Sequence, residues 1–488
     1  MTIRGGWLTA ALAGALLLCG CEEQRSGPVA VSAIGAEPRL HNPNLVPLDA
    51  ASKLLIQSTA QGLLKFDAAG QLEPALAQSW IVSNDGLRYT FRIRRTTWPD
   101  GSRVTADQVV GRLRAAASAA SRNPLKPLLG AIDEIMPMTE EVLEISLKSP
   151  RPNFLQLLAQ PELAIIRNGS GTGPFHAARE GGVIALHLPT EEEAEEDTPA
   201  EEDLQAPSVH LRGERAALAI ARFMDGKADL VTGGTVGDLP IARVAEPGDR
   251  LQFDPVAGLF GLSFGKNSGI LGDIEVRRAL AMAIDRPALV AALGVPDLQP
   301  RETLLPAGID ELPQPAIAAW TQVPLPTRRS QAAAAIAEAA EGTPVTLRVA
   351  IPEGPGYQLT FAHLRRDWRA IGVDAQAVRP TDRSADLRLI DSVAPVELAS
   401  WYLRQFTCEA SAICDPAADE IMAAARIAPT AANRQALLAN ADRILTDKIA
   451  FIPLAAPVRW SLVAPRLTGF RTNMFGRHSL EGLIAEER

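Results

Sequence analysis

One pentapeptide has the spacing of a catalytic motif. Gly261–Gly265 reads GLSFG and fits G-x-S-x-G, the pattern in which serine hydrolases present their nucleophile. That nucleophile needs a strand, a sharp turn at the serine and a helix that begins at once. Here the apolar residues within 259–264 predict one continuous strand, a polar loop follows at Lys266–Gly269, and no helix is expected before about Ile274. We therefore interpret the segment as a strand and predict no catalytic residue and no enzyme.

Metal and phosphate chemistry lack the residue spacing that they need. The six histidines are scattered along the chain, without the close spacing of zinc ligands. Gly169–Gly173 is rich in glycine but fits neither G-x-G-x-x-G nor a P-loop, because no Lys-Ser/Thr pair follows it. The sequence therefore predicts no metal and no cofactor.

Two cysteines near the C-terminal end, Cys408 and Cys414, are six positions apart. In an exported protein such a pair is expected to form a disulfide, which would stabilise a loop this small by roughly 2 kcal/mol. The alternative is a pair of free thiols that bind a metal, but no histidine lies close to them in the sequence.

The start of the chain predicts export. Trp7–Leu18 is apolar or small and follows a short segment that carries Arg4, which is the pattern of a secretory signal peptide and too short for a membrane span. Leu18–Cys21 resembles a bacterial lipobox, which implies cleavage before Cys21 and lipid on that cysteine. The alternative is an ordinary signal peptide with incidental cysteines. The resemblance implies a periplasmic protein that lipid chains anchor to a membrane.

Length and composition limit the possible classes of protein. The chain has 488 residues, of which 47% are hydrophobic, and this is enough for two or three domains with their own cores. Its net charge of −9 argues against nucleic acid as a partner. No other apolar run approaches the length of a span, so we expect the mature protein to be soluble apart from its anchor.

Local patterns predict the elements that would position a site. Asn84–Gly86 reads as a hairpin turn, and Tyr89, Phe91 and Ile93 alternate with polar residues as in a half-buried strand. Thr105 with a glutamine three residues later predicts a capping box at the start of a helix.

A second helix is expected near residue 276. Its apolar stripe consists of Val276, Ala279, Leu280, Ala283 and Ile284. The next residue, Asp285, is expected to cap a following helix that has a proline in its first turn.

These elements occur in an order that resembles the peptide-type solute-binding proteins of ABC importers, a family that also includes binders of nickel and other solutes. Residues 61–110 follow the family pattern almost without gaps. Further matches are GTGPF at 171–175, RFMDGKADL at 222–230, IEVRRALAMAIDR at 274–286 and FIPL at 451–454. The resemblance extends over residues 38–475.

The resemblance implies an α/β fold of the periplasmic-binding-protein type, with two α/β lobes joined by a hinge and an extra α+β domain on the first lobe. A solute would lie between the lobes, which close on it, and a membrane permease would recognise the closed form. The expected division is a signal peptide at 1–20, a linker at 21–36, lobe I at 37–50, 150–256 and 458–488, the extra domain at 51–149, and lobe II at 257–457.

The resemblance also implies one ligand-binding carboxylate. Alignment on Pro395 places Asp391, between Ile390 and Ser392, at the aspartate that binds the α-amino group in peptide-binding members. The tryptophan, the tyrosine and the second aspartate of the family pattern are absent around it, and Gly265 replaces a family asparagine. Asp391 is therefore predicted to bind an amine, with a structural cap or a surface position as the alternative.

Other binding candidates come with structural alternatives. Gly171, Thr172 and Gly173 would offer backbone donors and a hydroxyl, or form a plain turn. Trp401 could stack on a ligand or, with Tyr402 beside it, be a core aromatic of a helix. Arg39 could meet a carboxylate or remain at the surface.

The predicted function is that of a monomeric, lipid-anchored protein that captures short peptides for an ABC permease. The alternatives are the same scaffold with another ligand, such as an amine metabolite, a sugar oligomer or a metal chelate, or a lipoprotein that contacts other envelope proteins. Thr190–Asp203, with nine acidic residues, departs from the family pattern and is expected to form a solvated loop between two strands.

Overall fold

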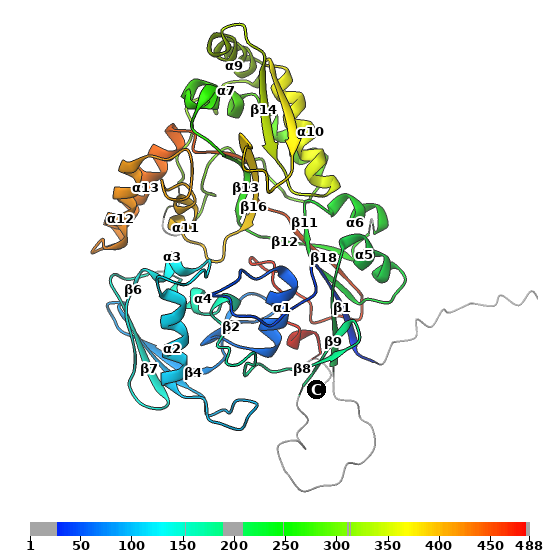
Figure 1. Ribbon diagram of the computed structural model, residues 1–488, viewed down its shortest axis with the longest axis vertical. Coiled ribbons are helices and arrows are strands. Elements are labelled where there is room, and N and C mark those ends of the chain that lie inside the picture. Colours follow the sequence, from blue (N-terminus) through cyan, green and yellow to red (C-terminus); the bar gives the residue numbers. More distant parts are fainter. Residues whose placement is uncertain are drawn as a thin grey trace, which may run out of the picture.

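The computed structural model has three parts, two of which are built on separate large sheets (Figure 1). Two expected features, the lipid-bearing Cys21 and the acidic loop Thr190–Asp203, lie outside the residues that the structure describes. Within the described part of the chain no helix is long and apolar enough to cross a membrane. The described residues are 27–151, 153–188, 208–246, 248–309, 312 and 314–484.

The sheet of lobe I has seven strands in the order β12-β18-β11-β1-β10-β9-β8. Along the chain they are β1 (Val29–Ile34), β8 (His176–Glu180), β9 (Val183–His187), β10 (Ser208–Glu214), β11 (Leu230–Thr235), β12 (Leu251–Asp254) and β18 (Arg459–Val463). The central strand, β1, runs parallel to both β10 and β11. The predicted linker at 21–36 is therefore wrong for residues 29–34, because Val29, Val31 and Ala33 alternate into the core of this lobe.

Helices cover the sheet of lobe I. They are α1 (Ala50–Thr59), α5 (Ala216–Met224) and α6 (Leu239–Ala245), and a short turn, η4 (Glu481–Leu483), lies near the C-terminal end. Ala51, Leu54 and Leu55 of α1 share a core with the strand residues of lobe I. The expected start of the extra domain at residue 51 is thus too early, because the apolar face of α1 is buried against the first lobe.

The extra domain is built on a four-stranded antiparallel sheet in the order β4-β5-β7-β6. Its strands are β4 (Ala77–Val82), β5 (Arg88–Ile93), β6 (Ile132–Pro137) and β7 (Val142–Leu147), with the hairpin β2 (Leu64–Phe66) and β3 (Leu72–Pro74) beside them. Its helices are α2 (Ala106–Ala117), α3 (Lys126–Leu129), α4 (Phe154–Leu158) and the turn η1 (Pro161–Leu163). The predicted hairpin turn and the Thr105 capping box are both confirmed.

Lobe II contains a five-stranded sheet in the order β15-β14-β16-β13-β17. Its strands are β13 (Gly258–Phe264), β14 (Val345–Ala350), β15 (Val373–Val378), β16 (Leu387–Val393) and β17 (Phe451–Ala455). Its helices are η3 (Gly269–Gly272), α7 (Ile274–Met282), α8 (Arg286–Leu293), α9 (Leu325–Ala340), α10 (Pro355–Arg369), α11 (Ala399–Arg404), α12 (Pro416–Arg426) and α13 (Ala431–Asp447). As predicted, Ser263 lies inside a continuous strand, and Asp285 caps α8.

The chain passes between the large sheets at 255–257, from β12 to β13, and at 456–458, from β17 to β18. Lobe II also contacts the extra domain, since Ser149 Oγ donates a hydrogen bond to the carbonyl of Arg426 at 2.7 Å and Arg434 Nη1 donates to that of Pro150 at 3.2 Å. Figure 1 shows α11 and α3 facing each other at this contact. Because lobe II touches the extra domain here as well as lobe I at the crossings, the lobes are closed in this structure.

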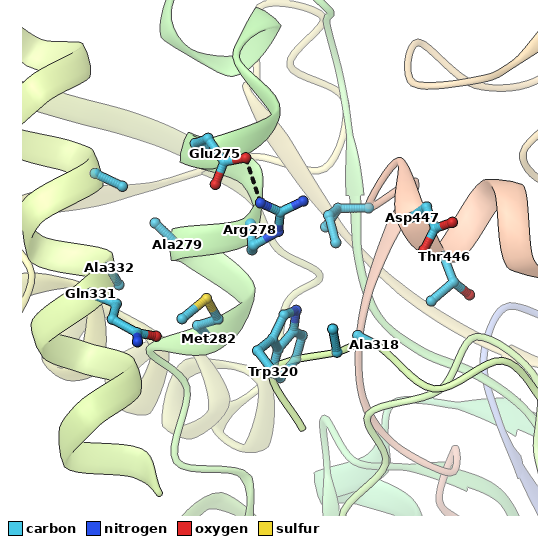
Figure 2. A pocket seen from close by; sticks show the side chains of 13 residues that line it. Glu275, Arg278, Ala279, Met282, Ala318, Trp320, Gln331, Ala332, Thr446 and Asp447 are labelled. Carbon is cyan, nitrogen blue, oxygen red and sulfur yellow. Dashed lines mark hydrogen bonds and ion pairs between the residues drawn. The ribbon is translucent and has the colours of Figure 1, made fainter. Parts of the chain in front are cut away.

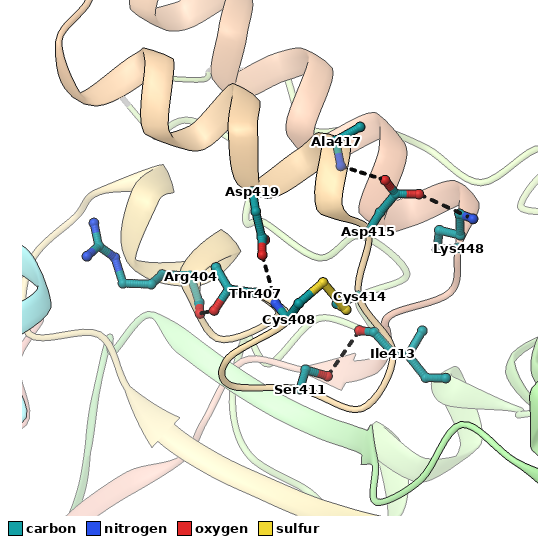
Figure 3. Close-up of a disulfide and its surroundings, with 10 residues drawn as sticks. All are labelled: Arg404, Thr407, Cys408, Ser411, Ile413, Cys414, Asp415, Ala417, Asp419 and Lys448. Carbon is teal, nitrogen blue, oxygen red and sulfur yellow. Dashed lines mark hydrogen bonds and ion pairs between the residues drawn. A yellow bond between two sulfur atoms is a disulfide. The ribbon is translucent and has the colours of Figure 1, made fainter.

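The predicted disulfide is present between Cys408 and Cys414, in the loop that joins α11 to α12 (Figure 3). The backbone N–H of Cys408 donates to Asp419 Oδ2 at 3.0 Å, and Asp415 accepts a hydrogen bond from Ala417 at the start of α12. The bond and these two carboxylates fix the loop against α12.

Candidate functional site: a polar network between the lobes

The carboxylate of Asp391 lies where the two lobes meet, and each of its oxygens accepts a hydrogen bond from another side chain. Arg459 Nη1 donates to its Oδ1 at 2.8 Å, and the Tyr357 hydroxyl donates to its Oδ2 at 2.6 Å. Only 4% of the Asp391 side chain is exposed, against 17% for Arg459. Asp391 and Tyr357 belong to β16 and α10 of lobe II, whereas Arg459 begins β18 of lobe I. This ion pair therefore joins the lobes beside a chain crossing.

Close backbone packing places Tyr357 at this position. The N–H of Gly356 donates to the carbonyl of Gly237 at 2.9 Å, and a Cβ on Gly356 would overlap the carbonyl oxygen of Val236. Glycine at this position lets the first turn of α10 lie directly on a loop of lobe I. Burial, together with the negative charge of Asp391, raises the pKa of Tyr357, so its hydroxyl keeps its proton and donates it to the carboxylate.

A second ion pair joins lobe I to the extra domain, on the other side of the contact from lobe II. Lys53 Nζ of α1 is 2.8 Å from Glu162 Oε1 of η1, with side-chain exposures of 28% and 3%. Burial alone would raise the pKa of Glu162, but the charges of Lys53 and Arg477 outweigh it and lower the pKa to about 2. The other oxygen, Oε2, is buried and has no hydrogen-bond partner among the described residues.

Gln160 connects this second pair to lobe II. Its Nε2 donates to the carbonyl of Pro395 at 2.6 Å, and its Oε1 accepts a hydrogen bond from Arg477. Burial lowers the pKa of Lys53, and repulsion from Arg477 and Arg459 lowers it further. We refer to the two ion pairs, together with Gln160 and Arg477, as the polar network between the lobes.

The structure places the other predicted residues of the Asp391 segment on a different face. Side chains alternate along a strand, so Ile390 and Ser392 point away from the face that carries Asp391. Ile390 packs against the core of lobe II. The structure therefore does not group these three side chains, and the amine-binding role of Asp391 stays a prediction.

The glycine turn packs against the end of α1. The N–H of Gly173 donates to the carbonyl of Thr59 at 3.0 Å, and Gln61 Nε2 donates to Thr172 Oγ1 at 3.2 Å. A Cβ on Gly171 or Gly173 would overlap the chain at residues 58–60. Close approach between two backbones thus explains both glycines without a ligand.

The aromatic and arginine candidates have structural contacts of their own. Trp401 packs against the cores of both lobe II and the extra domain, with its ring edge-on to Tyr402 at 4.9 Å between centroids. Arg39 is exposed, and its backbone N–H donates to Ser52 Oγ at 3.1 Å. We find no ion pair of the Arg39 side chain within the described part of the chain.

The sequence did not single out Lys53, Glu162, Arg477, Arg459 or Tyr357. One signal was available, because Arg459 is a lone charge within the apolar run of sequence that contains β17 and β18. A buried charge in such a setting usually has a partner. The identity of that partner depends on how distant parts of the chain meet, and no local pattern reports this.

Two cavities lie apart from this network. One of about 560 Å³ separates the extra domain from α11–α13 of lobe II and is lined on the lobe II side by Arg404, Arg426, Glu409 and Asp419. The other, of about 520 Å³, lies within lobe II between α7, α9 and the end of α13 (Figure 2). A site that closes around a solute must be bounded by two parts of the molecule. Of these two cavities only the first meets this condition, because the extra domain and lobe II both line it.

Comparison with known proteins identifies the family. Residues 71–203 and 209–404 match the bacterial extracellular solute-binding proteins, family 5. The chain belongs to this family. Members are the solute-binding components of ABC importers, so the predicted class of protein is confirmed.

Individual relatives are distant. The family-5 chain is 26% identical over 318 residues to the Escherichia coli protein named "Probable deoxycholate-binding periplasmic protein YgiS", covering 57% of the chain and 59% of that relative. It is 23% identical to the periplasmic oligopeptide-binding protein OppA of Escherichia coli, covering 84% of each. The crystal structure of Haemophilus influenzae OppA in complex with RPPGFSPFR superposes with a TM-score of 0.79 at 18% identity, covering 93% of this chain and 98% of that one. The predicted fold class is therefore confirmed.

Proposed function

We propose that this family-5 protein captures a small solute, in the first instance a short peptide, between its two lobes and delivers it to the permease of an ABC importer. It acts as a periplasmic monomer held at a membrane by lipid on Cys21. The single observation that carries the proposal is that two chain segments, 255–257 and 456–458, join the two large sheets, which is the connection that a hinge between two lobes requires. A ligand that contacts both lobes stabilises the closed form by its higher affinity for that form.

The likeness to oligopeptide-binding OppA over most of both chains supports a peptide as the solute. A non-peptide solute is the second candidate. It is favoured by the burial of the Asp391 carboxylate and by its hydrogen bonds to Arg459 and Tyr357, which leave little of it exposed to an amine. The likeness to a protein named for deoxycholate agrees with this candidate.

The test is to identify the solute that co-purifies with the mature protein by mass spectrometry, and to measure unfolding temperature against a solute panel. A ligand at about 100 times its dissociation constant stabilises the folded state by roughly 2.7 kcal/mol. We expect peptides to raise the unfolding temperature. If another class raises it and peptides do not, the peptide assignment is wrong, and if no solute does so, solute capture itself is contradicted.

A further inference from the structure

The cavity inside lobe II is formed by three helices and one loop. It has a volume of about 520 Å³, and residues 318–320, in the loop before α9, line it together with α7, α9 and the end of α13 (Figure 2). Much of the helical lining is small and apolar, with Ala279 on α7 and Ala332 and Ala335 on α9. Figure 1 shows α7 and α9 at the end of lobe II that is farthest from the other two parts of the molecule. The size is that of pockets that hold small molecules.

One polar atom in this lining is buried and lacks a partner. Trp320 is only 8% exposed, and its indole Nε1 has no hydrogen-bond partner among the residues that the structure describes. Figure 2 shows the edge of the ring that carries this nitrogen turned towards Arg278 of α7, which lines the same cavity. The hydroxyl of Thr446, another lining residue, is also buried and unpartnered within the described part of the chain. A buried donor without an acceptor is costly, so an acceptor inside the cavity would stabilise this arrangement.

The other buried tryptophans of the described chain differ from Trp320 in this respect. Each donates its indole N–H to a protein oxygen: Trp98 to Gln108 Oε1 at 2.8 Å, Trp368 to the carbonyl of Leu280 at 3.0 Å, and Trp460 to the carbonyl of Thr235 at 2.8 Å. The fold therefore supplies an acceptor for an indole wherever it buries one, except at this cavity.

The Trp320 ring is held in place by two buried arginines. The guanidinium carbons of Arg286 and Arg328 lie 5.7 and 5.5 Å from the ring centroid. Both arginines also contact one carboxylate oxygen, Glu302 Oε1, at 3.3 and 2.7 Å. Because these groups fix the orientation of the ring, its N–H is already positioned for an acceptor, and binding does not have to order it.

The charged residues of the lining are already paired. Arg278 forms an ion pair with Glu275, and Asp447 forms one with Arg443 at 3.2 Å. A charged ligand would lose its hydration in this cavity and find no unpaired charge among the described lining residues. The lining therefore favours an uncharged molecule.

We propose that this cavity is a second binding site, separate from the space between the lobes, for an uncharged and mainly apolar small molecule that carries an oxygen acceptor. The oxygen, as a carbonyl, ether or hydroxyl, accepts a hydrogen bond from Trp320 Nε1. The apolar part lies against Met282 and the alanines of α7 and α9. The inference goes beyond the proposed function, because the molecule bound here need not be the solute that the lobes enclose.

The test compares compounds that are matched in size and differ in one group. The mature protein, labelled with nitrogen-15, is titrated with 1-tetralone, with tetralin, which lacks the oxygen, and with 1-naphthoate, which is charged. NMR follows the indole N–H signals, and Trp320→Phe identifies the signal of Trp320. We expect 1-tetralone to shift this signal and to leave that of Trp368 unchanged. Tetralin should bind about 3- to 10-fold more weakly, since it cannot accept the hydrogen bond, and 1-naphthoate more weakly than 1-tetralone.

Some results of the titration would overturn the inference. No shift of the Trp320 signal with any of the three compounds would do so. A shift of Trp460 in place of Trp320 would have the same consequence, because Trp460 lies on β18 of lobe I. Binding of 1-naphthoate as tight as that of 1-tetralone would contradict the uncharged class of ligand.

Two variants test the site from opposite sides. Ala335→Leu fills the cavity without touching the donor and should weaken binding of 1-tetralone by about tenfold or more. Ala337→Leu is the matched control, since Ala337 is exposed on the same helix and should keep the affinity of the parent protein. Trp320→Phe keeps an aromatic ring but removes the N–H, so 1-tetralone should bind no better than tetralin. Equal affinities of the two alanine variants, or a preference for the ketone that survives in Trp320→Phe, would disprove the site.

Discussion

Two ion pairs with equally buried carboxylates differ in what they connect. Glu162 and Lys53 lie on η1 and α1, on the same side of the contact between the lobes, whereas Asp391 and Arg459 lie on strands of opposite lobes. The first pair keeps its geometry whether the lobes are open or closed. The second spans the lobes, so its geometry depends on how they are arranged. Similar chemistry therefore stabilises the fold in one case and the closed arrangement in the other.

The largest effect is expected from Glu162→Gln, which leaves Lys53 and Arg477 without their carboxylate. We expect a loss of roughly 3 kcal/mol in the free energy of unfolding at neutral pH. Because the pKa of Glu162 is lowered from 4.5 to about 2, its contribution is complete above about pH 4.5 and is lost as the pH falls towards 2.

Urea denaturation between pH 3 and pH 7 measures this contribution. The half-buried pair of Lys65 and Glu481 provides the control, since it is far more accessible to solvent and Glu481→Gln should change stability by less than about 1 kcal/mol. Equal losses for Glu162→Gln and Glu481→Gln would show that burial does not distinguish the two pairs.

A buried carboxylate that forms no ion pair with any described residue sharpens the comparison. Asp442 of α13 accepts a hydrogen bond from the N–H of Ala316 at 2.6 Å, and burial raises its pKa from 3.8 to about 6. The folded state therefore loses stability as the pH rises from about 4 to 6. Asp442→Asn should stabilise the protein by about 2 kcal/mol at pH 7 and have little effect at pH 4. A variant that is less stable at pH 7 would contradict this assignment.

Asp391→Asn tests the pair that crosses between the lobes. We expect a smaller effect on unfolding but a shift of about 1 kcal/mol towards the open arrangement, because Arg459 loses a charged acceptor. Small-angle scattering without solute should show a larger radius of gyration. An unchanged radius, or additive effects of Asp391→Asn and Arg459→Met, would mean that the pair does not hold the lobes together.

Ser263→Ala is expected to have the smallest effect. Ser263 lies within β13, and its hydroxyl donates to the carbonyl of Arg388 at 3.5 Å, a long and weak hydrogen bond. Solute binding and stability should both remain within experimental error of the parent protein. A loss of any hydrolytic activity in this variant would restore the nucleophile interpretation of the GLSFG motif.

Structural elements whose interacting residues are close together in the sequence could be predicted from the sequence. The Thr105 capping box, the Asp285 cap and the β13 strand all depend on residues within a few positions of one another. The disulfide was predicted from two cysteines six positions apart. In each case the interacting partners are close in the sequence, so their spacing alone carries the information.

The network between the lobes could not be predicted in the same way. Asp391 meets Arg459 across 68 positions and Tyr357 across 34, and Gln160 reaches Pro395 across 235. Which residues meet across such distances in the sequence depends on how the sheets are arranged, and no local periodicity of the sequence reports it. The family resemblance pointed to Asp391, but it did not reveal that an arginine of the same chain binds it.

The position of β1 has a consequence for how the protein reaches its native state. β1 is the first described strand of the chain, yet it lies in the middle of its sheet, and its neighbour β11 pairs with β18, which begins at Arg459. The sheet of lobe I thus cannot be completed until nearly the whole polypeptide has crossed the membrane. Loss of either end removes an inner strand, so we expect exported fragments to be degraded instead of accumulating as partly active receptors.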